Sequence, residues 1–509
     1  MIFPPRKNQR IIANAGSGKT YRLVSRYLEL LKREVPAERI IALTFTRKAA
    51  GEFLDRIFQR LQQGAASGDA DSGLTAAECA GHLRQLIEKM PRLALGTLDS
   101  FFGRMVRAFP FECGLAGEIT LMDGHALDLA RREALDALFR GQADDAAFAA
   151  FLDLIRQQNR NSEGRDVTNA LSREIDALHE GFLMSPPGCR WGDPSTIWPE
   201  GCALLAEENL PALVNSFETA IFESHSDMTD DYRRHWETLF QDLRSLRPGS
   251  TVPERAVKFA LRALDPPAMP KDSGKFYLTV SGNKRFGFSS RERPLAASLG
   301  RAILHFELAG RLARSRALYD LVARFEQPYQ KLVREAGRLT FTDITGLLAA
   351  AEGAAWAGGA ARPFDRQQMD FRLDATYDHW LLDEFQDTSR LQWQALRNLV
   401  DEVVQSDTGR RSFFYVGDTK QAIFTWRGGA PWLFDEIAEH YNASGTQRID
   451  TSEALDISRR SGPEILETVN TLFDPAHLGR LQADLGFPQK TLERWQSAWR
   501  EHRPHDATR

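Results

Sequence analysis

A glycine-rich loop near the start of the chain constrains the fold more than any other feature. Residues 13–20 read Ala-Asn-Ala-Gly-Ser-Gly-Lys-Thr, and a short strand-like stretch precedes them at residues 10–13. Apolar residues at helical spacing follow over residues 20–33. In such a strand–loop–helix unit, backbone N–H groups of the loop and the N-terminal end of the helix bind phosphate oxygens. The sequence therefore predicts a parallel sheet with a phosphate-binding loop after its first strand.

The residues of this loop have predicted roles in binding ATP and Mg²⁺. Lys19 is expected to bridge the β- and γ-phosphates, and the hydroxyl of Thr20 is expected to ligate Mg²⁺. The alternative is a Gly/Ser turn followed by a surface lysine. The loop residues predicted to contact the nucleotide are Ala13, Asn14, Ala15, Gly16, Ser17, Gly18, Lys19 and Thr20.

An acidic pair after a second apolar strand supports this interpretation. Leu381 and Leu382 precede Asp383 and Glu384 in the segment Leu-Leu-Asp-Glu-Phe-Gln-Asp-Thr. Asp383 is placed to hold Mg²⁺ through water, and Glu384 is placed to orient or deprotonate an attacking water. A solvated acidic helix start is the alternative, because Asp and Glu favour the first turns of helices. Together the loop and the acidic pair predict an ATPase.

Two further residues are candidates for contacts with the transferred phosphate. Gln421, in the segment Val-Gly-Asp-Thr-Lys-Gln, is expected to contact the γ-phosphate and report its presence. Arg460 is a candidate for an arginine that stabilises charge in the transition state from a second lobe. The alternatives are a polar side chain that caps a turn for Gln421, and a surface arginine in a basic patch for Arg460.

Strand-like and helical segments alternate at both ends of the chain but not in its middle. This alternation is typical of an α/β fold with a parallel sheet and crossover helices. The segment between the two ends is mostly helical, with a hairpin expected at residues 275–289. Strands are predicted at residues 10–13, 39–45, 93–97, 380–382 and 413–416. The predicted domains are a split ATPase domain (1–120 and 335–445), a helical insertion (121–334) and a C-terminal segment (446–509).

Composition excludes several classes of protein. The net charge of −4 indicates no generally basic surface, so a nucleic-acid site is expected to be a local groove. The four cysteines lie far apart without a Cys-x-x-Cys pair, which argues against a zinc or iron–sulfur site and fits a reduced, cytoplasmic setting. No run approaches the ~18 apolar residues of a membrane span.

Aromatic and hydroxyl side chains follow three of the predicted strands. Aromatic rings at such loops can stack on bases, and hydroxyls at helix N-termini can hold backbone phosphates. Each cluster by itself is equally consistent with the hydrophobic core, but three at equivalent positions favour a track for single-stranded nucleic acid. The predicted DNA-contacting residues are Phe45, Thr46, Thr97, Ser100, Phe101, Phe424, Trp426 and Arg427.

The order and wording of these motifs resemble a known family. AxxGxGKT, TFTxxAAxE, TLDSFF, DEFQDT and VGDxKQAIFxWRGG occur in this order in the chain. They are similar to the motifs of superfamily 1 helicases of the UvrD/Rep type, and their residues most resemble those of the AddA/RecB branch of helicase–nucleases. An unrelated P-loop kinase or transporter ATPase would not explain the block at residues 416–429.

The resemblance implies both an architecture and an activity. It implies a RecA-like ATPase domain that is split by the helical insertion, and ATP-driven 3′→5′ movement on single-stranded DNA in recombination and repair. The implied partners are single-stranded DNA, duplex junctions and a nuclease or helicase partner subunit. The family often places an arginine after the loop threonine and a tyrosine before the second-lobe arginine, both packing on adenine. Here these positions are Tyr21 and Arg459, so the resemblance implies a swapped stacking pair.

The C-terminal region is where the chain departs most from this resemblance. We expect residues 446–509 to form only the beginning of a second RecA-like domain, because no match to the later motifs V and VI precedes Arg509. Two interpretations follow. The chain is a helicase that moves on DNA, or it is an ATP- and DNA-binding fragment or subunit that is inactive as a motor until a partner supplies the second lobe.

Overall fold

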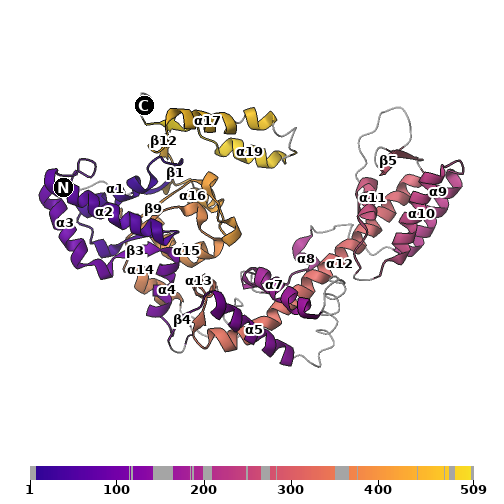
Figure 1. Ribbon diagram of the computed structural model, residues 1–509, viewed down its shortest axis with the longest axis horizontal. Coiled ribbons are helices and arrows are strands. Elements are labelled where there is room, and N and C mark those ends of the chain that lie inside the picture. The colour runs from indigo at the N-terminus through magenta and orange to yellow at the C-terminus, as the bar shows by residue number, and fades with distance from the viewer. Residues whose placement is uncertain are drawn as a thin grey trace. The chain divides into compact units, whose positions relative to one another are not determined.

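The computed structural model groups the chain into two compact units. Unit 1 contains Met1–Ala130 and Gln330–Arg509, and unit 2 contains Arg131–Tyr329 (Figure 1). The structure describes residues 7–113, 115, 118–141, 164–183, 185, 188–198, 209–247, 250–264, 276–281, 284–289, 291–349, 366–374, 376–443, 445–474, 476–480, 486 and 488–505.

Unit 1 is built on a seven-stranded sheet with the order β10-β1-β9-β8-β2-β3, and β11 also pairs with β1. Each of these pairings is parallel. The predicted α/β class is therefore confirmed, and the predicted strands are present with ends shifted by two residues or fewer. The strands are β1 (Asn8–Ala13), β2 (Ile40–Thr44), β3 (Ala94–Thr97), β8 (His379–Leu382), β9 (Ser412–Gly417), β10 (Ile449–Asp450) and β11 (Ala454–Leu455).

Both faces of this sheet are covered by helices, because the strands are apolar on both sides. Ile40 and Ala42 of β2 point into a core shared with α1, α2 and α3, whereas Ile41 and Leu43 point into a core shared with α4, α13, α15 and α16. The helices of unit 1 are α1 (Lys19–Lys32), α2 (Arg47–Ser67), α3 (Ala76–Glu88), α4 (Leu98–Ala108), α13 (Phe341–Ala349), α14 (Arg366–Asp374), α15 (Arg390–Val404), α16 (Leu433–Asn442), α17 (Pro463–Phe473) and α19 (Gln489–Ala498).

The sheet extends beyond residue 445, where the sequence predicts the split domain to end. β10 and β11 both pair with β1 and satisfy backbone groups that an edge strand would otherwise expose. Further along the chain, β12 (Ile457–Ser458) and β13 (Arg503–Pro504) form a separate parallel pair. The chain thus runs along the edge of the sheet in β10 and β11 and then departs from the sheet. β4 (Thr120–Leu121) and β7 (Arg338–Leu339) form another short pair within unit 1.

Unit 2 and the chain that leads into it are mostly helical, as predicted. A core around Phe217, Trp236 and Phe240 is shared by α9, α10, α11 and α12, and α12 is 38 residues long. The predicted hairpin is present as β5 (Phe276–Ser281) and β6 (Lys284–Phe288). The helices are α5 (Gly124–Gly141), α7 (Gly164–Leu183), α8 (Pro194–Ile197), α9 (Leu210–Ser224), α10 (Asp230–Ser245), α11 (Glu254–Leu264) and α12 (Glu292–Tyr329). Among the described helices, none combines the length and apolarity that crossing a bilayer requires.

A buried ion pair in unit 1 leads to a stability prediction. Arg334 Nε donates to Asp343 Oδ1 at 2.7 Å, and both residues are almost fully buried. Asp343→Ala would remove the carboxylate that Arg334 Nε contacts from a buried position, so we expect the free energy of unfolding to fall by about 3–5 kcal/mol. Urea denaturation measures this, with the exposed Glu402→Ala as control, for which a change within about 0.5 kcal/mol is expected. Equal effects of the two substitutions would contradict the prediction.

The same pair predicts a direction of pH dependence. Burial by itself would raise the pKa of Asp343, but the Arg334 charge and hydrogen bonds from Thr340 lower it below its ordinary value. Because the folded-state pKa is depressed, the pair stabilises fully above the unfolded pKa of about 4. That contribution is lost as the pH falls through the folded-state pKa.

Candidate active site

The glycine-rich loop joins the end of β1 to the start of α1. Gly16 and Gly18 have φ values of 73° and 94°, in the left-handed region that favours glycine. A Cβ at Gly16 would also lie 2.7 Å from Arg460 Cβ. Ser17 Oγ donates to the Asn14 carbonyl oxygen at 2.7 Å and tightens the turn. Both glycines are therefore required by the backbone shape of the loop.

Lys19 lies at the centre of the site, in the first turn of α1. Its Nζ donates to Glu384 Oε2 at 2.6 Å and to Gln421 Oε1 at 3.4 Å. The structure thus brings together three predicted residues that belong to three different strand ends. Thr20 follows in the same turn and is partly exposed.

The two acidic residues after β8 have different environments. Asp383 is buried, and this burial, with the Glu384 charge beside it, raises the pKa of Asp383 to about 7. Glu384 adopts φ 50°, which is rare for a residue other than glycine. Burial and the Glu384 charge also raise the pKa of Asp387 to about 6. The strand end therefore gathers three carboxyl groups, and Lys19 Nζ contacts one of them, that of Glu384, directly.

Gln386 is a buried member of this site that sequence reasoning missed. Its Nε2 donates to Glu384 Oε2 at 2.8 Å, and its Oε1 accepts from the Asp418 backbone N–H at 3.0 Å. Asp418 Oδ2 in turn accepts from Gln421 Nε2 at 2.8 Å. These bonds and those of Lys19 close a ring of five residues. Gln386 belongs to the DEFQDT motif, but the sequence gives no indication that it pairs with Asp418, which lies in a different loop.

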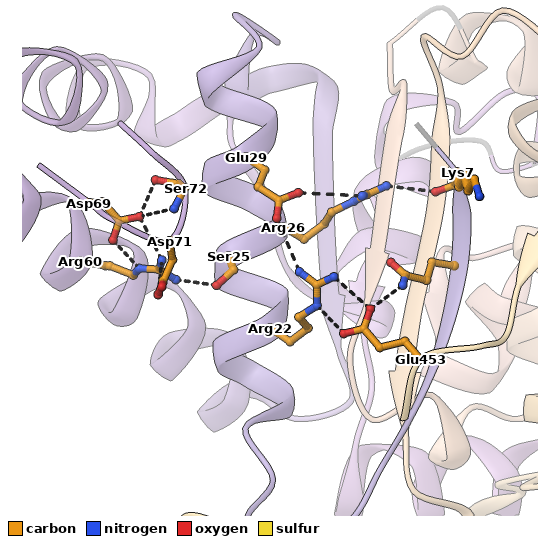
Figure 2. Close-up of polar contacts among 11 residues, drawn as sticks. Lys7, Arg22, Ser25, Arg26, Glu29, Arg60, Asp69, Asp71, Ser72 and Glu453 are labelled. Atoms are coloured by element: carbon orange, nitrogen blue, oxygen red, sulfur yellow. Dashed lines mark hydrogen bonds and ion pairs between the residues drawn. The ribbon is translucent and has the colours of Figure 1, made fainter. Parts of the chain in front are cut away.

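A carboxylate anchors the segment that brings Arg459 and Arg460 to the loop. Glu453 accepts a hydrogen bond from Arg22 Nε at 2.8 Å (Figure 2). It also accepts one from Gln9 Nε2 at 2.6 Å. The Asn14 N–H donates to the Leu455 carbonyl oxygen at 2.8 Å. Downstream, the Arg459 N–H donates to the Gly16 carbonyl oxygen at 2.8 Å. The backbone that carries Arg460 therefore lies against the glycine-rich loop.

Tyr21 and Arg459, the pair implied by the family resemblance, also lie close together. The Arg459 guanidinium carbon lies 5.8 Å from the centroid of the Tyr21 ring. Tyr21 is 45% exposed, so part of its ring remains open to solvent.

The structure brings two of the three predicted aromatic clusters together. The Phe45 and Phe424 ring centroids lie 4.9 Å apart, and those of Phe424 and Trp426 lie 6.4 Å apart. Trp426 is 75% exposed. Thr46 caps α2 by accepting from the Ala49 N–H at 3.1 Å. Arg427 closes the single helical turn Thr425–Arg427 after Phe424.

The third cluster differs from the prediction. Thr97 and Ser100 form a capping box at the start of α4, in which each side chain bonds the backbone of the other residue. Phe101 is only 1% exposed, and its ring packs edge-on against Trp380 at 5.6 Å. No ring face is left for a base, so the prediction that Phe101 contacts DNA is corrected: this residue belongs to the core. The sequence TLDSFF contains two adjacent phenylalanines, but it does not indicate which side of the helix faces the sheet.

Comparison with known proteins shows which family the chain belongs to. The family model described as the UvrD/REP helicase N-terminal domain matches residues 1–442. The chain belongs to the UvrD/REP helicase family. The matched residues of this UvrD/REP family member include the glycine-rich loop, the acidic pair, Gln421 and the aromatic residues Phe424 and Trp426.

Curated relatives are similar over nearly the whole chain. The AddA subunit of an ATP-dependent helicase/nuclease from Geobacillus kaustophilus is 25% identical over 500 residues, which is 91% of this chain and 38% of the relative. Proteins of the same name from Streptococcus suis and Limosilactobacillus fermentum are 23% and 26% identical, and each alignment covers 93% of this chain. The chain thus spans about 38% of the length of the first of these relatives. The resemblance to the AddA branch of the UvrD/REP family is confirmed.

Proposed function

We propose that this protein is an ATP-dependent DNA helicase that couples ATP hydrolysis to 3′→5′ movement on single-stranded DNA in recombination and repair. One observation carries the proposal: Lys19, Glu384 and Gln421 converge, and Gln421 lies three residues before Phe424, whose ring neighbours that of the exposed Trp426. A γ-phosphate and a DNA base would thus meet the same short loop.

The residues present fit ATP and Mg²⁺. The glycine-rich loop offers backbone N–H groups for phosphates, and Lys19 offers the cation for the β- and γ-phosphates. Thr20 and Asp383 are the proposed Mg²⁺ ligands, because hard oxygen donors suit that cation and a buried carboxylate gains most from a nearby positive charge. When bound, the metal would neutralise phosphate charge. Glu384 would accept the proton of the attacking water, and Arg460 would add charge stabilisation.

The ring of hydrogen bonds that includes Gln386 supports a change of partner at Lys19, from Glu384 to the phosphates, when nucleotide binds. In this structure Lys19 holds the carboxylate of Glu384, the same group that is proposed as the base. Phosphates would compete for the ammonium group and release Glu384 for its catalytic role. Gln386 is hydrogen-bonded to both Glu384 and Asp418, so it would fix the position of the catalytic base Glu384 relative to the loop that carries Gln421. Tyr21 and Arg459 are proposed to flank the adenine base.

Replacing an exposed aromatic should weaken DNA binding without affecting nucleotide binding. We expect Trp426→Ala to lower the affinity for a labelled single-stranded oligonucleotide by roughly 1–3 kcal/mol, because base–aromatic stacking contributes about that much. Fluorescence anisotropy measures the DNA affinity, and calorimetry checks that MgATP affinity is unchanged. Trp432→Ala, at a tryptophan that is 53% exposed, is the matched control. Equal DNA affinity in Trp426→Ala and wild type would contradict the proposed track.

ATP turnover by the 509-residue chain, with and without single-stranded DNA, tests the function directly. Turnover stimulated by DNA, with unwinding of 3′-tailed but not 5′-tailed duplexes, is the expected result for a motor. Nucleotide binding without turnover would favour the alternative, an ATP- and DNA-binding subunit that needs a second lobe. The relatives are named as subunits of a helicase/nuclease, and on that basis we propose that this chain also binds duplex junctions and a partner subunit.

A further inference from the structure

A second guanidinium lies over the ring of Tyr21, closer than that of Arg459. The Arg60 guanidinium carbon is 4.8 Å from the Tyr21 ring centroid, compared with 5.8 Å for Arg459. Arg60 belongs to α2, and its side chain is only 11% exposed. Planar guanidinium groups stack favourably on aromatic faces. Tyr21 itself is the residue next to Thr20 in the glycine-rich loop motif.

Arg60 is held by an extensive polar network (Figure 2). Its Nε and Nη2 donate to the two carboxylate oxygens of Asp69, both at 2.9 Å. Nη2 also donates to Asp71 at 3.0 Å, and Nη1 donates to Ser25 Oγ at 2.6 Å. The guanidinium therefore links α1 and the loop after α2, and its plane is fixed by a bidentate pair.

The Asp69 carboxylate is itself held in place by the loop after α2. Its Oδ2 accepts from the backbone N–H of Ser72 at 2.9 Å and from the Ser72 hydroxyl. The Asp69 N–H donates to the Leu74 carbonyl oxygen at 2.8 Å. The loop is thus folded around the carboxylate that orients Arg60. A surface arginine that only added solubility would not need this arrangement.

We propose that Arg60 is a positioning residue that holds the Tyr21 ring in place for the base of a purine nucleoside triphosphate. This inference rests on the proposed function and deepens it. Tyr21 is 45% exposed, and an exposed side chain would otherwise lose rotamer freedom when a base binds. A ring that is already ordered by Arg60 does not lose that freedom again. The contribution concerns the nucleotide base, because the contacts of Arg60 named above involve none of residues 13–20 that would hold the phosphates.

Comparing a ligand that has a base with one that lacks it tests this role. We expect Arg60→Met to raise the Kd for MgATP by about tenfold, as expected for loss of a stacking contact. The Kd for magnesium tripolyphosphate should stay within about twofold, because that ligand has no base to stack. Tyr21→Ala should show the same split, and the double variant should lose no more than Tyr21→Ala alone. Arg60→Lys should not rescue affinity, because an ammonium group cannot form the planar fork.

Two controls keep the outcomes distinct. Arg84→Met removes an exposed arginine from the neighbouring α3 and should change neither Kd. If Arg60→Met does not fold, Asp69→Asn carries the test, because it keeps the side-chain shape but loses the ion pair. Equal weakening of both ligands, or of neither, would overturn the role of Arg60. Failure of the wild type to bind either ligand would instead overturn the proposed phosphate site.

Discussion

Lys19→Ala is expected to lower the affinity for MgATP by about 100-fold, because it removes a charge-assisted contact from a largely buried position. Lys19 is 9% exposed and is the cation closest to Glu384 in the described part of the site. Without it, the phosphates would meet the carboxylates of Asp383 and Glu384 without the ammonium group that contacts Glu384 in this structure. Calorimetry with a slowly hydrolysed ATP analogue measures the loss directly.

The control for this substitution is Lys48→Ala. The Lys48 side chain is 88% exposed at the start of α2, so its removal deletes the same charge from a solvated position. We expect its effect on the nucleotide Kd to stay within about twofold, because solvent screens such charges. Equal ATP affinity in wild type and Lys19→Ala would refute the assignment of the glycine-rich loop as the phosphate site.

Glu384→Gln is expected to abolish most ATP turnover while nucleotide binding is retained. A positioned general base contributes about 10²–10⁴-fold to rate, and an amide cannot accept the proton of the attacking water. The amide oxygen can still accept a hydrogen bond from Lys19, so the loop geometry should persist. Nucleotide affinity should be equal or higher, because phosphates no longer compete with a carboxylate for the Lys19 ammonium.

The measurement is steady-state turnover and nucleotide Kd on the same preparations, alone and with any partner that supports hydrolysis. Glu402→Gln, at an exposed position of α15, is the isosteric control and should leave both quantities unchanged. Turnover within about twofold of wild type in Glu384→Gln would assign the base to a different residue. A parallel loss of binding and turnover would mean that Glu384 has a structural role.

Glu384 is the acceptor that two other residues of the site share. This residue, in a left-handed conformation, accepts from both Lys19 and Gln386. The geometry places the strain and the charge on the residue proposed to do the chemistry, as is common for active sites. Arg60 illustrates a second kind of support, in which a fully bonded guanidinium orders an aromatic ring at the edge of the site.

Local sequence determined much of the fold in unit 1. Short apolar runs predicted β2, β8 and β9 because both faces of these strands are buried. The glycines at 16 and 18 and the acidic pair at 383 and 384 were recognisable because their chemistry depends on neighbours within a few residues. The family resemblance added the arrangement of the motifs, and the family match confirmed it.

Only the tertiary structure decided which residues meet across the chain. Lys19 and Glu384 are 365 positions apart, and the partnership of Gln386 with Asp418 joins two loops that no periodicity relates. Phe101 follows a predicted strand, as Phe45 does, but the packing of α4 against the sheet buries it beside Trp380. Arg60 showed no motif at all, and its contact with Tyr21 comes from the packing of α1 against α2. Periodicity specifies which face of an element is apolar, whereas long-range pairing depends on how all the elements pack together.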